Sequence, residues 1–342
     1  MDVSIASDSD QQLWDDIVFS SDEGTLFHTW KWLKIMERHN RKKIFSRHYR
    51  GILYPLIVRE GDEIIGLMPV FFYKSPLLKI AASPPFSVEN YYLGPVMKKN
   101  DAIRAHRKQH LVYKFQQAID HFLKNTLKSN YISIHSSPDM IDPRSFIWSG
   151  YNVEPEFTNI IDISTGEKIV WENFSQTVRN TVNKLEKRGV STDTGSKEEV
   201  ELIYNLLQGR QRIHATKDFL LEIFKNFYPN NLNFFIAKKG DVPLTGIITI
   251  SYKDKVSVWI GSPKITVDGI SPNYILHWEG IRWACNNNYK KFEILGASDP
   301  TLFGFKSKFN GEIIPFYSMK WYSPLNRFMI SVYNGLYPRY PL

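Results

Sequence analysis

The chain has 342 residues, which is enough for about two domains of ordinary size. Hydrophobic residues make up 43% of it and aromatic residues 14%, a composition that predicts packed cores and excludes an intrinsically disordered chain. The net charge of +8 favours an anionic partner, such as RNA, a phosphorylated compound or a membrane surface, although simple solubility explains it equally well.

The cysteine content and the N-terminus indicate the compartment. One cysteine, Cys285, excludes disulfides and cysteine-type zinc sites and favours a reducing environment. The acidic, polar N-terminus Met1–Ile5 is not a secretion signal, and no apolar run approaches the ~20 residues of a membrane span. We therefore expect a cytoplasmic protein.

The first third of the chain contains a basic run and a turn-rich loop. Basic side chains are dense from Arg38 to Arg50, which indicates either an RNA contact or a charged loop. The loop over 82–95, which contains Tyr92, is a candidate lining of a cleft or a structural connector. His106 and His110 have i,i+4 spacing, but no nearby carboxylate completes a ligand set, so we predict no metal site.

Two similar hairpins indicate an internal duplication. Residues 57–66 form a strand and a Gly-Asp turn that lead into a strand over 67–73. Residues 236–246 do the same and lead into 247–252. Because Gly-Asp turns are common, coincidence is the alternative to duplication.

The halves are also alike beyond the hairpin. Each has a long helix, then Asn-Tyr and a strand, at 130–134 and at 288–292. Hairpin, helix and strand thus recur in one order, which predicts two tandem α/β domains. Pro155 interrupts the periodicity between them, so we place the domains at 1–155 and 156–342.

The second half begins with a basic amphipathic helix. Ser175 is a plausible cap, an apolar stripe comes next, and Gly189 stops the helix. The opposite face carries Arg179, Lys187 and Arg188. Such a face either binds phosphate or tRNA or is simply solvated.

The segment from 271 to 311 is the most informative. Ser271 and Pro272 start a helix that is apolar nearly all round and therefore buried, and a strand comes after it over 291–295. Phe305 then opens the motif Phe-Lys-Ser-Lys-Phe-Asn-Gly. At the end of the chain, apolar spacing predicts an amphipathic helix over 324–334 that docks on the protein's own surface rather than on a membrane.

The arrangement of buried helix, strand and Phe-Lys-x-x-Phe resembles the C-terminal half of the Fem-type aminoacyl transferases. Those enzymes attach amino acids from charged tRNA to cell-wall precursors and resemble two fused GNAT-like (acyl-CoA N-acyltransferase-like) domains. The resemblance implies that Lys306 stabilises the oxyanion that develops during acyl transfer. It also implies that Phe305 contacts the substrate or packs beneath it, while a surface lysine is the alternative for Lys306.

Other segments extend the resemblance over most of the chain. Phe27 to Lys34 resembles the start of the family's first-domain helix, where a lysine after the tryptophan reaches the precursor, so Lys34 is the candidate. Met36 stands where the family has a second lysine, a departure that bears on the contact with the sugar nucleotide. Arg210 or Arg212 would bind the precursor's phosphate, since a guanidinium donates two parallel hydrogen bonds.

We therefore predict an acyltransferase that forms an amide, with an aminoacyl-tRNA as donor and an anionic envelope precursor as acceptor. No cofactor and no DNA partner are expected. The rival interpretation is an N-acyltransferase that uses acyl-CoA as co-substrate on an envelope sugar or lipid, but the Gly-rich phosphate cradle of such enzymes is absent from 261–270. A non-catalytic GNAT-like binding protein is the third. Glu279 and Asp299 are the carboxylates nearest to the motif in sequence, and neither is assigned as a general base.

Overall fold

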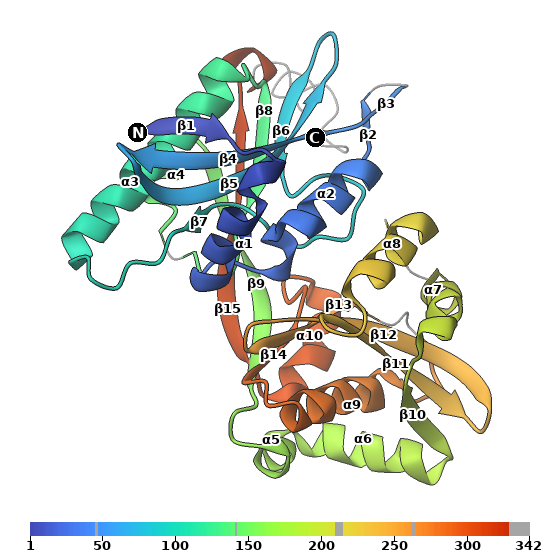
Figure 1. Ribbon diagram of the computed structural model, residues 1–342. Helices are drawn as coiled ribbons and strands as arrows, with labels where there is room; N and C mark the ends of the chain where they lie inside the picture. Colours follow the sequence, from blue (N-terminus) through green and yellow to red (C-terminus); the bar gives the residue numbers. More distant parts are fainter. Residues whose placement is uncertain (45–46, 141, 209–214, 262–264, 328–342) are drawn as a thin grey trace. The chain divides into compact units, whose positions relative to one another are not determined.

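The computed structural model describes residues 1–44, 47–140, 142–208, 215–261 and 265–327. The chain forms two compact units, each a sheet with helices packed against it (Figure 1). Among the described residues, unit 1 consists of those in 1–156 and 316–327, and unit 2 consists of those in 157–315.

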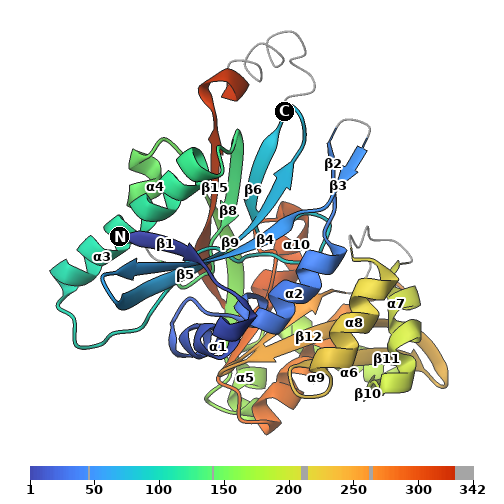
Figure 2. The same cartoon turned by 45° about the horizontal axis from the view of Figure 1, so that its top comes forward.

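Unit 1 is built on a mostly antiparallel sheet of order β1-β4-β5-β6-β8-β15, and only the β6–β8 pair is parallel. Its helices cover the sheet, and β2 and β3 form a separate hairpin (Figure 2). The strands are β1 (Asp2–Ile5), β2 (Lys42–Ile44), β3 (Arg47–Tyr49), β4 (Ile52–Glu60), β5 (Glu63–Lys74), β6 (Lys79–Ser83), β7 (Val96–Met97, paired with β5), β8 (Tyr131–His135) and β15 (Glu312–Tyr322, in this unit from Phe316). The helices are α1 (Gln11–Ser20), α2 (Trp30–His39), α3 (Ala105–His121) and α4 (Arg144–Trp148).

Unit 2 repeats this plan with the order β10-β11-β12-β13-β14-β9, in which only the β13–β14 pair is parallel. Its strands are β9 (Asn152–Asp162, in this unit from Phe157), β10 (Val190–Thr194), β11 (Leu232–Lys239), β12 (Val242–Tyr252), β13 (Lys255–Ile260) and β14 (Lys291–Ile294). Its helices are α5 (Glu167–Asn173), α6 (Gln176–Lys187), α7 (Val200–Gln208), α8 (Lys217–Phe227), α9 (Asn273–Asn286) and α10 (Pro300–Lys306).

The two strand orders and directions coincide position by position, so the predicted duplication of α/β domains is confirmed. The difference from the expected boundaries concerns the sixth strand of each sheet. β9 comes after β8 in sequence but pairs with β14, whereas β15 comes after β14 and pairs through Ser318–Tyr322 with β8. The described residues from Phe316 to Arg327 therefore belong to unit 1, not to the C-terminal domain of 156–342.

The predicted elements form for the expected reasons. Gly61 and Gly240 have positive φ in the β4–β5 and β11–β12 turns, where a left-handed residue is needed. The Ser175 hydroxyl accepts a hydrogen bond from the amide of Val178 and caps α6. Helix α9 is buried over most of its length, but Pro272 occupies its N-cap rather than its first position.

A close approach between the backbone and a buried side chain requires the glycine that ends the Phe-Lys-Ser-Lys-Phe-Asn-Gly motif. A Cβ built on Gly311 would lie 1.9 Å from the side-chain oxygen of Asn159, so only glycine fits there without movement. Asn159 is fully buried. In contrast, Gly304 in α10 has open space around it.

The C-terminal prediction is only partly covered. Residues 324–327 are helical, and the amide of Arg327 donates to the carbonyl of Ser323. The rest of the predicted helix, 328–334, lies outside the described residues. Among the helices that the structure describes, none has the length and apolar character needed to cross a membrane.

Candidate active site around Lys306

Lys306 is the last residue of α10, and its position depends on the way this helix begins. The Asp299 carboxylate accepts a hydrogen bond from the amide of Thr301 at 2.8 Å, and Pro300 comes after the cap, where a missing N–H is tolerated. The helix then carries the Lys306 side chain inward, where it is 6% exposed. Its Nζ donates a hydrogen bond to the Leu295 carbonyl. The alternative of a surface lysine is therefore wrong.

The Leu295 carbonyl marks the point where two parallel strands stop pairing. β13 and β14 are in register from Lys255–Lys291 to Val258–Ile294, and Leu295 is the next residue of the chain. Gly296 comes next with φ of 75°, which turns the backbone away. Lys306 thus places a positive charge at the point where the parallel pairing of β13 and β14 stops.

Burial controls the charge state of this ammonium. Desolvation lowers the pKa of Lys306 to about 8, and the nearby Asp299 carboxylate opposes that change. At neutral pH the side chain therefore remains mainly protonated. An ammonium has three N–H donors, so the bond to Leu295 leaves two for other acceptors.

Phe305 belongs to an aromatic cluster that supports the lysine. Its ring lies edge-on to Tyr274 at 4.9 Å, to His277 at 5.0 Å and to Phe309 at 5.1 Å between centroids. The side chain is half-buried. These contacts favour the packing role for Phe305, with one part of the ring still open to solvent.

Two buried residues of unit 2 escaped the sequence analysis. Nδ1 of His277 lies 2.8 Å from the Asn273 carbonyl, so it carries the proton. Burial, assisted by the charge of Lys306, lowers the pKa of His277 to about 4. A neutral imidazole of such low basicity is a poor general base at neutral pH. The only sequence signal was its place in the buried helix.

Glu293 on β14 is the second missed residue. Its fully buried carboxylate accepts from Thr158 at 2.8 Å and from Ser257 at 2.7 Å, and the ammonium of Lys255 lies 3.0 Å away. Burial favours the neutral acid, but Lys255 and the hydroxyl donors outweigh it and lower the pKa of Glu293. The charged pair of Glu293 and Lys255, with its two hydroxyl donors, therefore links β9, β13 and β14.

The two carboxylates considered from the sequence have structural partners. Glu279 binds Arg282 and accepts from Thr192 at 3.1 Å. Asp299 caps α10. Neither arrangement identifies a general base.

The basic side chains predicted on α6 lie on its outer face. Lys187 and Arg188 are exposed, and Arg188 donates to the Asp268 carbonyl at 3.1 Å. Arg179 is half-buried and donates to the Glu172 carbonyl and to Gln176. The helix therefore offers exposed cations, as the sequence predicted. Arg210 and Arg212 lie outside the described residues.

The candidates in unit 1 have different surroundings. Lys34 lies on α2, with its Nζ 3.3 Å from Asp8 and 3.8 Å from Glu37. Tyr92 is only 1% exposed and packs edge-on against Phe27 and Phe316. Tyr92 is thus a core residue rather than the lining of a cleft, because its ring fills the space between neighbouring aromatic side chains.

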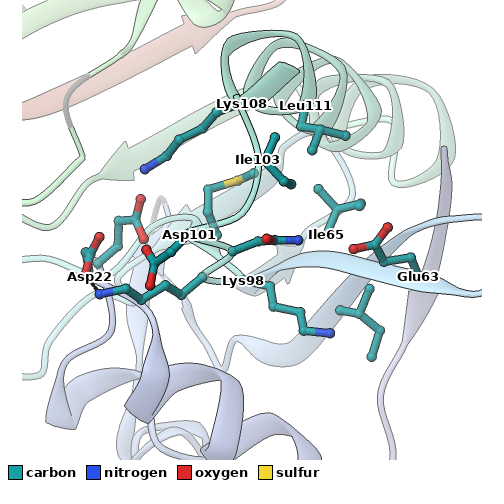
Figure 3. A pocket seen from close by; sticks show the side chains of 13 residues that line it. Asp22, Glu63, Ile65, Lys98, Asp101, Ile103, Lys108 and Leu111 are labelled. Atoms are coloured by element: carbon teal, nitrogen blue, oxygen red, sulfur yellow. Dashed lines mark hydrogen bonds and ion pairs between the residues drawn. The ribbon is translucent and has the colours of Figure 1, made fainter. Parts of the chain in front are cut away.

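Unit 1 contains a small polar pocket beside α3 (Figure 3). Its volume is about 50 Å³, and Asp22 pairs with Lys99 at 3.2 Å in its wall. Burial raises the pKa of Glu23, which also lines it, to about 7. No cluster of metal-ligating side chains occurs among the described residues.

Comparisons with known proteins identify the family of the segment that contains Lys306. Residues 172–307 match the family described as acetyltransferase (GNAT) domain. This segment is a GNAT domain. It holds α6 to α10, and Lys306 lies at its end. The GNAT domain identifies the protein as an acyltransferase, as the sequence predicted. No curated protein matches the chain.

Solved structures extend the likeness to the whole fold. FemX has a TM-score of 0.65 at 12% identity, covering 93% of this chain and 97% of that chain. A protein of unknown function from Bacteroides thetaiotaomicron has a TM-score of 0.56 at 10% identity, covering 94% and 99%. A tandem GNAT protein from the clavulanic acid biosynthesis pathway has 0.51 at 10%, covering 94% and 98%. The predicted tandem GNAT-like fold is confirmed, and the Fem-type resemblance holds at the level of this fold.

Proposed function

We propose that the protein transfers an aminoacyl group from charged tRNA to an amine of an anionic cell-envelope precursor in the cytoplasm. The buried ammonium of Lys306 is the observation that carries the proposal. It stands in the Phe-Lys-x-x-Phe motif of the Fem-type resemblance, within a fold that is similar to FemX over 93% of the chain. The exposed cations of α6 support an RNA donor, since they suit backbone phosphates.

The proposed step makes one bond and breaks one. The acceptor amine attacks the ester carbonyl carbon of the aminoacyl-tRNA, a C–N bond forms, and the C–O bond to the ribose breaks. The ribose hydroxyl leaves with a proton that the amine releases. Negative charge develops on the carbonyl oxygen in the transition state, and the free N–H donors of Lys306 stabilise it there more than in the ground state.

The acceptor would be held by cations. Lys34 is proposed to reach the precursor, in which case its phosphate replaces the Asp8 and Glu37 partners. Arg210 or Arg212 is proposed as a second phosphate ligand, because the guanidinium fork matches phosphate oxygens.

The alternative function is acyl transfer from acyl-CoA to an envelope sugar or lipid. The GNAT domain match favours it, because that family is described as acetyltransferase. The donor is tested by incubating the protein with radiolabelled aminoacyl-tRNA and, separately, with labelled acyl-CoA, each with an amine-bearing envelope precursor. Label transfer from tRNA alone supports the proposal, transfer from acyl-CoA alone replaces it, and transfer from neither leaves the non-catalytic interpretation.

A further inference from the structure

We propose that one end of the unit 1 sheet is a docking surface for an anionic lipid membrane. Three segments meet there: the β5–β6 turn, the residues before β8, and the turn after β15 (Figure 1). We call this surface the basic-apolar end and define it by residues 74–79, 124–131 and 322–327. Both views place the three segments at the same end of the sheet (Figure 2).

Asn130 holds the three segments together. Its Oδ1 accepts from the Lys79 amide at 2.8 Å, and its own amide donates to the Lys79 carbonyl at 2.8 Å. Its carbonyl accepts from the Ser323 amide at 2.8 Å and from Asn326 Nδ2 at 3.3 Å. The basic-apolar end is therefore one connected surface rather than three independent loops.

Large apolar side chains protrude from this surface. Leu77 is 78% exposed at the tip of the β5–β6 turn, and Leu325 is 68% exposed on the last described turn. Leucines at such exposure gain from insertion among lipid chains, because burial removes apolar area from water. The Pro76 ring precedes Leu77 and restricts the turn that presents it.

The charge of the surface has a single sign. It carries the exposed Lys74, Lys128 and Arg327 and the half-buried Lys79, whereas the ammonium of Lys124 is held inward by Asp120 and by the Ser149 carbonyl. The three defining ranges contain no Asp or Glu. Lysines and arginines next to a bilayer are attracted by anionic headgroups, and exposed leucines add an apolar contribution that a nucleic acid backbone cannot use. Leucines and cations together therefore favour a membrane over RNA.

The test is co-sedimentation of the purified full-length protein with vesicles. Vesicles of phosphatidylcholine alone are compared with vesicles that contain phosphatidylglycerol. We expect binding only to the anionic vesicles and weaker binding as salt rises. Lys74→Gln combined with Lys128→Gln should weaken binding by about 25-fold, at roughly fivefold per cation. Leu77→Ser should weaken it by about tenfold.

Matched controls lie in unit 2. Lys168→Gln with Lys197→Gln removes the same charge from exposed positions, and Val242→Ser changes an apolar side chain that is 63% exposed. The proposal is overturned if the wild type fails to bind anionic vesicles or if these controls lose as much binding. A loss with the lysine pair but none with Leu77→Ser would indicate a general polyanion contact and would also overturn it. Because all these side chains are exposed, melting temperatures should stay unchanged.

Discussion

Replacing Lys306 by methionine tests whether this side chain serves catalysis or folding. The substitution keeps the length of the side chain and removes its charge. In the folded protein, desolvation lowers the lysine pKa from 10.5 to about 8, which corresponds to a cost of about 3 kcal/mol at neutral pH. The lost hydrogen bond to the buried Leu295 carbonyl costs about 1–3 kcal/mol. The two effects oppose each other, so Lys306→Met should be as stable as wild type or slightly more stable at pH 7.

The pH dependence of the free energy of unfolding tests whether burial of the Lys306 charge destabilises the fold. Between pH 8 and 10.5 the unfolded chain binds more protons at Lys306 than the folded protein does, so this group makes the wild type more stable as pH rises. The Lys306→Met variant lacks that contribution. Its stability relative to wild type should therefore decline across this range, as measured by urea unfolding at pH 7, 8, 9 and 10.

Activity should change much more than stability. An oxyanion donor in a preorganised site contributes roughly 3 kcal/mol, so the initial rate with the active donor should fall about 100-fold. The wild-type rate should also fall above pH 8, as the ammonium loses its proton. Lys308→Met is the matched control, since its Nζ contacts the hydroxyl and the ring of Tyr274 and has no role in the proposed step. A Lys306→Met variant with near-full rate would remove the residue from the mechanism, and one that unfolds at neutral pH would show it to be structural.

Four further substitutions test the packing and charge of the two units. Gly311→Ala should lower the free energy of unfolding by about 1–3 kcal/mol, because the added Cβ would collide with the buried Asn159 amide. Gly304→Ala, where space is open, should raise that free energy by about 0.5–1 kcal/mol. Equal effects of the two substitutions in urea titrations would argue against the close approach at Gly311. Glu293→Gln should cost about 3 kcal/mol by leaving Lys255 without its carboxylate, and a neutral result in thermal melting would mean that the buried charge pair contributes nothing. The pKa of Glu23 is raised from 4.5 to about 7, so its carboxylate destabilises the fold increasingly as pH rises through this range. Glu23→Gln should therefore increase the free energy of unfolding by up to about 3 kcal/mol at pH 8 and leave it unchanged near pH 4. An increase independent of pH would contradict the raised pKa of Glu23.

The sequence by itself determined the local elements and the repeat. The Gly-Asp turns, the apolar stripe of α6 and the buried character of α9 depend on spacing within a few residues, which periodicity and turn chemistry report directly. The prediction of a duplicated α/β fold rested on the repeated order of these elements. The Phe-Lys-x-x-Phe motif likewise directed attention to Lys306 before any contact of that side chain was known.

Only the tertiary structure decided which strand completes each sheet and what surrounds each candidate side chain. The pairing of β15 with β8 joins residues 183 to 191 positions apart, and no local pattern encodes such a partner. For the same reason the sequence placed Tyr92 at a surface that its aromatic neighbours fill, and missed His277 and Glu293. Their burial, charge state and partners depend on β9, β13 and α10, which the fold brings together from distant parts of the chain, and pKa values respond to that assembled environment rather than to sequence neighbours.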